Sequence, residues 1–408
     1  MDEYDVAMLL MQADAEDVGE VFRDWMRGMA RRTVLRVFEA ETQALCGALY
    51  RPDAGSPCYR AGSAPGTVLH EGRKDEVRRP RVRRRKEDGM TEEVRLSSYE
   101  AAQEPGHLEE MLLRALCAGV STRGQKDVYP ESPANSKSSV SRLWQREGAK
   151  MLDEFRTRDI KRDDWLVLML DGVRLANELW AVVALGVAED GTKHMLDFEI
   201  GASENTAVAT ALCARLAERG FAPKAGCRLL CVFDGAKALR KGAKKVWGDP
   251  VFQRCLVHKE RNLRRYLSKR HWGALAQCIK RLRMVQGAQD AREALAQLRS
   301  FVQGKNAEAL ASLDEAGDEM IALHLLEVPN TLHRNLLSTN IIENAIRNMR
   351  GKLGRVTRWR EETDQPSRWM ALALIETEKG FRKLAGYRDL PWLAQALARK
   401  PEAMADAA

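Results

Sequence analysis

The sequence predicts a mixed α/β sheet in the middle of the chain, with helices on either side of it. Continuous apolar runs recur between residues 165 and 257, and "WLVLML" at 165–170 is typical of a strand buried on both faces. Two intervening stretches, 204–219 and 236–247, have the apolar spacing of helices. Beyond the sheet, residues 259–328 have helical spacing throughout. This change of period along the chain predicts the α/β class.

The order of the strands predicts how the sheet is connected. The strands are expected at residues 165–170, 179–190, 193–200, 228–233 and 251–257. The first three follow one another directly, and the turn "EDGT" joins the second to the third. The last two are each reached through a helix. A meander followed by helical crossovers predicts a five-stranded mixed sheet.

Composition limits the class of protein. The 408 residues include 66 Lys and Arg against 58 Asp and Glu, and the net charge of +8 favours a polyanionic partner such as nucleic acid. The eight cysteines form no C-x-x-C pair, which is typical of reduced thiols rather than of a disulfide framework. No apolar run approaches ~18 residues, and the acidic start "MDEYDVAMLL" has no cleavage pattern. We therefore expect a cytoplasmic protein with no membrane span and no signal peptide.

The N-terminal part of the chain predicts helices followed by a basic segment. Residues 1–50 have helical apolar spacing, and short strands are expected at 68–70 and 76–82. Residues 73–86 hold nine basic residues against two acidic ones. This concentration of arginine predicts phosphate binding, and the alternative is a solvated charge run. The residues expected to contact DNA here are Arg78, Arg79, Arg81, Arg83 and Arg84.

Residues 106–160 have the pattern of a helix-turn-helix. A helix is expected at 108–118, followed by the glycine turn "GVSTR" and by a second helix that opens at Ser138 or Ser139. Ser141 and Arg142 lie near the start of that second helix, where side chains of a recognition helix enter the major groove. An ordinary helical linker is the alternative.

Two Asp-Gly pairs stand where predicted strands end. Asp171 follows the first strand in "LDG" and Asp234 follows the fourth in "FDG", and Gly172 and Gly235 are expected to let the chain turn away. If these strands are neighbours, both carboxylates face one crevice at the carboxyl edge of the sheet. Two such charges repel each other unless a divalent cation binds both. Each Asp-Gly taken alone is also a common turn.

A third carboxylate lies in "STNIIENAIRNMR" at 338–350. The apolar residues of this stretch recur at helical spacing and predict one buried stripe, and Glu343 lies off that stripe. It would complete the ligand set of two hard cations, while a surface ion pair with Arg347 is the alternative. The basic residues that follow are expected to contact the DNA backbone. They are Arg347, Arg350, Arg355 and Arg358.

Taken together, these motifs resemble those of the mutator-type transposases of bacterial insertion sequences. The resemblance is carried by "LDGV" with Asp171, "VFDGAKALRKGAKKVW" with Asp234, "FQRCLVHKERNL" with Cys255 and His258, and "STNIIENAIRNMRGKLGRVTRW" with Glu343. It implies an RNase H-like fold, interrupted by an all-helical insertion in the long gap between the second and third acids. It also implies a D-D-E triad formed by Asp171, Asp234 and Glu343.

The resemblance further implies a mechanism and partners. The triad would hold two Mg²⁺ ions, with Mn²⁺ as a substitute, and would cleave DNA at the terminal inverted repeats and join the ends to target DNA. Cys255, His258 and Asn340 would support the active site. The active form is expected to be a homodimer or a higher assembly on DNA, associated with the bacterial nucleoid.

Two other functions and one other site remain open. The chain could be a nuclease or resolvase of the same fold without strand transfer, or a catalytically silent DNA-binding regulator. The Cys-x-x-His pair formed by Cys255 and His258 could be half of a zinc site, but no second half with suitable spacing follows.

The expected domain organisation follows from these motifs. In chain order it comprises an N-terminal helical region (1–57), a basic strand and loop segment (58–105), a helix-turn-helix-like region (106–160), the first part of the catalytic core (161–258), the all-helical insertion (259–332), the second part of the core with the glutamate helix (333–386) and a C-terminal tail (387–408).

Overall fold

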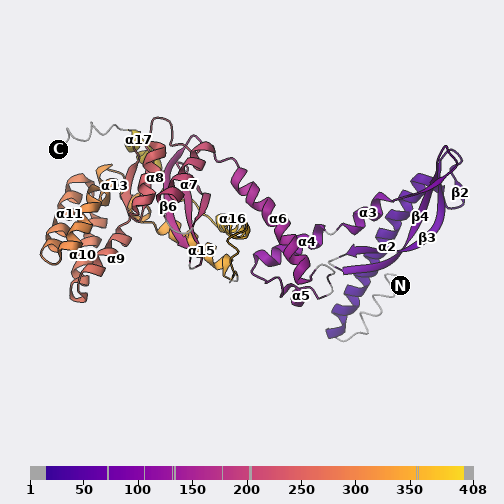
Figure 1. Cartoon of the computed structure of the whole chain (residues 1–408). Coiled ribbons are helices and arrows are strands. Elements are labelled where there is room, and N and C mark those ends of the chain that lie inside the picture. The colour runs from indigo at the N-terminus through magenta and orange to yellow at the C-terminus, as the bar shows by residue number, and fades with distance from the viewer. Residues whose placement is uncertain are drawn as a thin grey trace. The chain divides into compact units, whose positions relative to one another are not determined.

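The computed structural model describes most of the chain as two compact units. They comprise Met1–Trp144 and Gln145–Ala408. The described residues are 15–70, 73–104, 106–130, 132, 135–176, 178–201, 205–354, 356 and 358–398. Within these ranges, every helix is too short or too polar to cross a membrane. Figure 1 traces both units from indigo to yellow.

In the first unit, a long helix packs on an antiparallel sheet. The helix is α2 (Ala15–Cys46), and the sheet has the order β3 (Cys58–His70), β4 (Arg73–Arg85) and β5 (Thr91–Val94). Two small strands, β1 (Gly47–Ala48) and β2 (Arg51–Pro52), and the helix α3 (Ser97–Gln103) complete this part. The strands are longer than the sequence predicted, because β3 and β4 pair along a hairpin. The core between helix and sheet consists of Phe38, Cys46, Cys58, Val68, Val77, Val82 and Leu96.

Three helices follow in the region expected to be a helix-turn-helix: α4 (Gly106–Cys117), α5 (Gln125–Val128) and α6 (Lys137–Thr157). Gly119 ends α4 in a left-handed conformation with φ +97°. The N–H of Val120 donates to the carbonyl of Ala115 (2.9 Å), which is the six-to-one bond of a Schellman cap. The buried side chain of Gln125 donates to the carbonyl of Leu112 (3.1 Å) and ties α5 to α4.

The second unit contains the five-stranded mixed sheet that the sequence predicted. Its order is β10-β9-β6-β7-β8, in which β6, β7 and β8 are antiparallel neighbours and β9 and β10 run parallel to β6. The strands are β6 (Trp165–Arg174), β7 (Trp180–Ala188), β8 (Lys193–Gly201), β9 (Leu230–Phe233) and β10 (Val251–Arg254). The last strand is shorter than predicted, because Cys255 caps the helix that begins at Leu256.

Helices cover both faces of this sheet, as Figure 1 shows. On one face, α7 (Thr206–Glu218) and α8 (Lys237–Trp247) pack against Leu168, Leu170, Cys231 and Phe233. On the other face, α15 (Asn340–Leu353) and α16 (Gln365–Glu378) share a core with Val167, Met169, Leu230 and Val232. Alternate residues of each strand thus serve opposite layers.

An all-helical segment separates β10 from α15, as predicted. It contains α9 (Leu256–Tyr266), η1 (Lys269–His271), α10 (Trp272–Met284), α11 (Gly287–Gln303), α12 (Ala307–Ala316), η2 (Gly317–Met320), α13 (Ala322–Leu325) and α14 (Asn330–Leu336). The described chain ends with η3 (Tyr387–Asp389) and α17 (Leu390–Ala398), whose leucines are buried.

Candidate functional site

Asp171, Asp234 and Glu343 belong to elements that meet on one face of the sheet. Met169 and Val173, on either side of Asp171 in the alternation of β6, belong to the core shared with α15. The same core contains Val232, two residues before Asp234. Because side chains two apart on a strand share a face, Asp171 lies on the side that α15 covers, while Asp234 directly follows the end of β9.

The two aspartates follow neighbouring parallel strands at corresponding positions. The parallel strands β6 and β9 pair up to Met169 and Val232, and Asp171 and Asp234 each lie two residues beyond that pair. The condition on which the sequence prediction depended, that these two strands are neighbours, is therefore met.

One detail of the sequence prediction is wrong. Asp171 does not end its strand: β6 continues to Arg174, with Asp171 opposite Val183 and Gly172 opposite Val182 of β7. Pairing with β7 keeps this stretch extended, so Gly172 makes no turn. Gly235 does make the expected turn, with φ +110°, and a β-carbon there would collide with the buried guanidinium of Arg254.

Glu343 lies in the first turn of α15, whose predicted apolar stripe is buried. Its Oε1 lies 2.7 Å from Oγ1 of the buried Thr339 and 3.7 Å from Nε2 of His258. Arg347 donates instead to the side chain of Asn344 (3.4 Å). The carboxylate of Glu343 therefore points toward α9 and is not held in a surface ion pair with Arg347.

Cys255 links the end of β9 to the helices α9 and α15. Its N–H donates to the carbonyl of Phe233 (2.8 Å), at the end of β9. Its buried Sγ accepts the N–H of His258 (3.5 Å), in the first turn of α9, and the N–H of Thr339 (3.3 Å), which precedes α15. A backbone bond from the N–H of Leu256 to the carbonyl of Leu337 (3.0 Å) runs alongside. These bonds connect Cys255 with Thr339, which lie 84 positions apart in the chain.

The same contacts shift the pKa values of Cys255 and His258. Burial raises the pKa of the Cys255 thiol, but hydrogen bonds with His258 and Thr339 outweigh it and leave this pKa below its ordinary value. The hydrogen bond with Cys255 raises the pKa of His258 to about 9, against desolvation and with further attraction from Glu343 and Asp234. The imidazole of His258 therefore lies in the combined negative field of two of the predicted triad residues.

Three different metal-ligating side chains meet at this point. Sγ of Cys255, a ring nitrogen of His258 and a carboxylate oxygen of Glu343 all lie within 4.8 Å of one another. The sequence showed the Cys-x-x-His pair but not its third member, because Glu343 comes from a helix on the far side of the all-helical segment.

A concave surface adjoins Asp234 on the side of the helical segment. This cavity has a volume of about 720 Å³, and its lining includes Asp234, Lys237 and Lys259. Arg254 forms its buried wall and pairs with Glu315 (3.1 Å) and with Glu319 (2.9 Å). Sequence reasoning missed this arginine, since only the fold brings its carboxylate partners to it.

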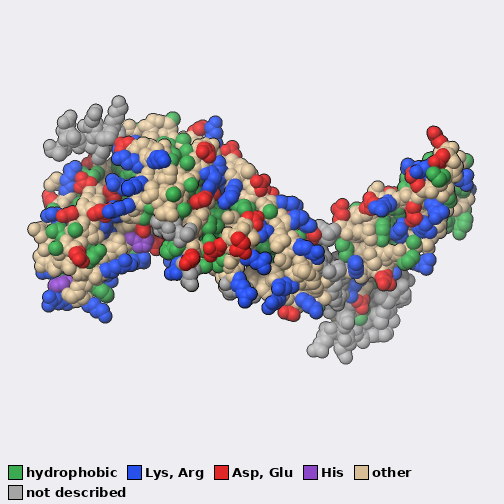
Figure 2. Space-filling view, viewed as in Figure 1, with side chains coloured by type: hydrophobic (Ala, Val, Ile, Leu, Met, Phe, Trp, Pro, Cys, Tyr) green, Lys and Arg blue, Asp and Glu red, His purple; other side chains and the backbone are tan. Residues whose placement is uncertain are grey.

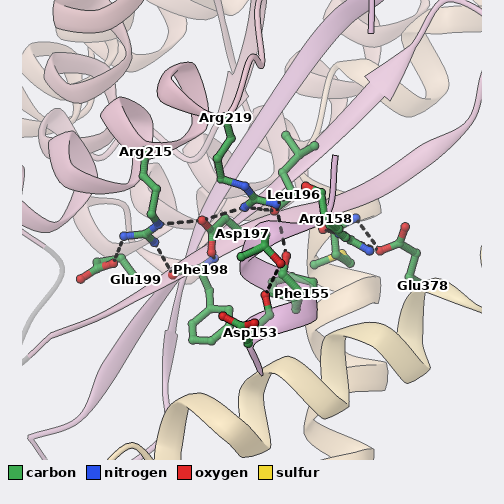
Figure 3. A network of polar contacts seen from close by, with 12 residues as sticks. Asp153, Phe155, Arg158, Leu196, Asp197, Phe198, Glu199, Arg215, Arg219 and Glu378 are labelled. Carbon is green, nitrogen blue, oxygen red and sulfur yellow. Dashed lines mark hydrogen bonds and ion pairs between the residues drawn. The ribbon is translucent and has the colours of Figure 1, made fainter. Parts of the chain in front are cut away.

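A second group of carboxylates in this unit is already neutralised by arginines, as Figure 3 shows. Asp197 on β8 is fully buried and pairs with Arg215 (2.7 Å) and Arg219 (3.1 Å). Arg215 also pairs with Glu199 (2.6 Å). These carboxylates have a structural role, and their cationic partners leave no need for a metal ion.

Part of the positive charge of the basic strand β4 is paired with carboxylates of the neighbouring strand. Arg81 and Arg79 pair with Glu93 at 2.7 and 3.5 Å. Arg84 pairs with Glu92 at 3.9 Å. Both glutamates lie on β5, which the hairpin brings alongside β4. The other two predicted DNA-binding residues of this strand are the exposed Arg78 and the half-buried Arg83.

The remaining predicted residues lie mostly on the surface. On α6, Arg142 is exposed and Ser141 half-buried. Asn340, the first residue of α15, is exposed, as are Arg347, Arg350 and Arg358, whereas Arg355 lies outside the described residues. Figure 2 shows that basic and acidic side chains are interspersed over the visible face of the protein.

Comparison with known proteins gives consistent matches over this sequence. The family model described as "Transposase, Mutator family" matches residues 1–378. The chain is 27% identical over 249 residues to the transposase for insertion sequence element IS905 of Lactococcus lactis, covering 58% of this chain and 60% of the relative. It is 28% identical to the transposase for insertion sequence element IS256 in transposon Tn4001 of Staphylococcus aureus, covering 57% and 60%.

A third relative matches over most of both chains. This is the transposase for insertion sequence element ISRM5 of Rhizobium meliloti, 27% identical over 380 residues, or 89% of this chain and 90% of the relative. For the first two relatives, the chain spans about 60% of their length.

Proposed function

We propose, from the premise that this chain belongs to the Mutator family of transposases, that it is the DNA transposase of an insertion sequence. Its catalytic centre would be a D-D-E triad of Asp171, Asp234 and Glu343 on an RNase H-like fold. The observation that supports the proposal is the parallel pairing of β6 with β9, after whose last pair, Met169 and Val232, Asp171 and Asp234 each follow by two residues.

The donor set of the triad suits a hard divalent cation. Three carboxylates from separate elements offer only oxygen ligands, which Mg²⁺ and Mn²⁺ prefer. The raised pKa of His258 comes first from its hydrogen bond with Cys255, and Glu343 and Asp234 add to it. Asp171, Asp234 and Glu343 would hold two Mg²⁺ ions, which supply an activated water and stabilise the leaving oxygen of the phosphodiester.

The other residues of the site would orient the Glu343 carboxylate and bind the DNA backbone. Thr339 fixes the direction of the Glu343 carboxylate through its hydroxyl. His258, protonated at neutral pH, presents a cation beside Glu343, where a DNA phosphate would bind. Arg347 and Arg350 lie exposed further along α15 and would contact the DNA backbone.

The DNA substrates would be the terminal inverted repeats of the element and the target into which the ends are joined. The basic residues of β4 and the start of α6, with Ser141 and Arg142, would contact the repeats in a helix-turn-helix-like manner. We expect a homodimer or a larger assembly on DNA, at the bacterial nucleoid.

Replacement of one aspartate tests this proposal. Asp234→Asn should leave binding to inverted-repeat DNA unchanged and abolish cleavage in Mg²⁺, because an amide is a poor ligand for a hard cation. Asp249→Asn is the matched control, since Asp249 is largely exposed, and it should cleave like the wild type. Cleavage by Asp234→Asn at the wild-type rate would remove Asp234 from the catalytic centre.

A strand-transfer assay separates the transposase from a nuclease or resolvase of the same fold. Cleavage is common to all of them, whereas joining a labelled 3′ end to a plasmid is not. Joined products in the wild type and their loss in Asp234→Asn support the transposase. Cleavage without joined products would favour the nuclease.

A further inference from the structure

Cys255, His258 and Glu343 form a compact cluster of three ligand types, which we call the Cys–His–Glu cluster. Their ligand atoms lie within 4.8 Å of one another, and Nε2 of His258 is 3.7 Å from Oε1 of Glu343. The three residues come from the end of β10, the first turn of α9 and the first turn of α15. None of the roles proposed for the carboxylate triad requires a sulfur at this place.

We propose that the Cys–His–Glu cluster binds one zinc-class divalent cation. Zinc takes thiolate sulfur at about 2.3 Å and imidazole nitrogen or carboxylate oxygen at about 2.0–2.2 Å, so that neighbouring ligand atoms of a tetrahedral site lie roughly 3.3–3.7 Å apart. The observed separation of His258 and Glu343 falls at this spacing. The cluster is therefore close to a zinc geometry without rearrangement of the backbone.

The surroundings of the sulfur are those of a metal-bound thiolate. Sγ of Cys255 accepts the N–H groups of His258 (3.5 Å) and Thr339 (3.3 Å), and donors of this kind stabilise negative charge on a sulfur. Cys213, equally buried, lies instead on α7 among apolar core residues. Of these two thiols, only Cys255 lies among polar donors and next to two other metal-ligating side chains.

Three protein ligands leave a fourth position of the tetrahedron for water or for a further carboxylate. Asp234 directly follows Phe233, whose carbonyl accepts the N–H of Cys255 (2.8 Å), and is a carboxylate close to the cluster in the fold. His258 and Glu343 are each about one-quarter exposed, at 23% and 22% of their side chains, so an ion can enter from solvent.

The cluster shares Glu343 with the proposed triad, and one consequence rests on the proposed function. An ion held by Cys255, His258 and Glu343 would draw the Glu343 carboxylate away from the Mg²⁺ ligands. Zinc would then oppose Mg²⁺-dependent cleavage. It would also fasten α9 to α15 and raise the thermal stability of the protein.

Cobalt substitution tests the site without DNA or activity. Full-length protein, treated with a chelator and titrated with Co²⁺, should bind one equivalent and develop a thiolate-to-cobalt charge-transfer band. Cys255→Ser should lose this band. His258→Gln should weaken Co²⁺ binding by more than the roughly 10–100-fold that loss of an outer-shell partner costs. Cys278→Ser is the matched control, because this half-buried thiol lies on α10, and it should titrate like the wild type.

Two results would overturn the site: no charge-transfer band in the wild type, or the same band in Cys255→Ser. If Cys255→Ser does not fold, the variant His258→Gln, at a side chain about one-quarter exposed, decides, and unchanged Co²⁺ affinity in that variant contradicts the proposal. Asp171→Asn keeps the two proposals separate. It should retain the cobalt spectrum while losing DNA cleavage, so failure of the triad and failure of the cluster are seen in different measurements.

Discussion

The hydroxyl of Thr339 lies 2.7 Å from Oε1 of Glu343, one helical turn further along α15. Thr339 is fully buried, and the same hydroxyl is 3.3 Å from Sγ of Cys255. The direction of the Glu343 carboxylate is thus set by a group anchored in the core. A glutamate has three rotatable side-chain bonds, so this contact decides where its charge is held.

Removing that hydroxyl should impair cleavage through Glu343. Thr339→Val keeps the size and branching of the side chain but loses the hydrogen bond. A bond to a charged group contributes about 1.5–3 kcal/mol, so single-turnover cleavage should fall roughly 10- to 100-fold. Thr339→Ser, which keeps the hydroxyl, should recover most of the rate. Equal rates for the valine and serine variants would rule out a positioning role for Thr339.

The buried carboxylate of Asp197 should be important for stability. Asp197→Ala leaves Arg215 and Arg219 partly buried without their shared partner. Breaking such a pair costs about 3–5 kcal/mol, to be measured as the loss in the free energy of unfolding in urea. Asp249→Ala, at an exposed ion pair, should cost much less. If the two variants are equally stable, the arginines have found other partners.

Acid should destabilise the helical segment through a buried histidine pair. Burial lowers the pKa of His333 to about 4, with nearby His324 adding to the shift, and the two rings lie 4.4 Å apart. A lowered folded-state pKa means that the unfolded chain binds the proton first. The stabilisation is therefore complete above about pH 6.5 and is lost as the pH falls towards 4.

The size of this acid effect can be measured by substitution. The lowered pKa of His333 corresponds to a loss of on the order of 3 kcal/mol in the free energy of unfolding as the pH falls from 6.5 to 4. His333→Phe keeps a buried ring that does not titrate, so its free energy of unfolding should depend less steeply on pH over this window. A slope equal to that of the wild type would show that His333 does not titrate there.

Binding to DNA should depend more on Arg347 than on Arg81. Arg81 already pairs with Glu93 at 2.7 Å, whereas Arg347 is exposed and contacts only the amide of Asn344 among the described contacts. Arg347→Ala should reduce the salt slope of DNA binding by about 1, as one phosphate contact is lost. Arg81→Ala should reduce it less. Fluorescence anisotropy across a salt series makes the comparison, and the reverse order would show that Arg81 contributes more to DNA binding than Arg347 despite its ion pair with Glu93.

Local pattern in the sequence predicted much of the second unit. Continuous apolar runs predicted the five strands, and the stripe from Ile342 to Met349 predicted the buried face of α15. Both signals come from residues close together in the chain, where period alone reveals which side is buried.

Long-range pairing accounts for what the sequence did not predict. Asp171 remains in β6 because Val183 of the next strand pairs with it. Glu93 neutralises arginines of β4 only because β5 folds alongside. Cys255 meets Thr339 across 84 positions, so the third member of the Cys–His–Glu cluster had no local signal.

The convergence of three distant carboxylates on one pair of metal ions is tested most directly by counting bound Mn²⁺. Electron paramagnetic resonance on the full-length protein with inverted-repeat DNA should find two Mn²⁺ ions per chain in the wild type. Each of Asp171→Asn, Asp234→Asn and Glu343→Gln should bind fewer. If Glu343→Gln binds two Mn²⁺ ions with wild-type affinity, Glu343 is not a ligand and the three residues do not form one centre.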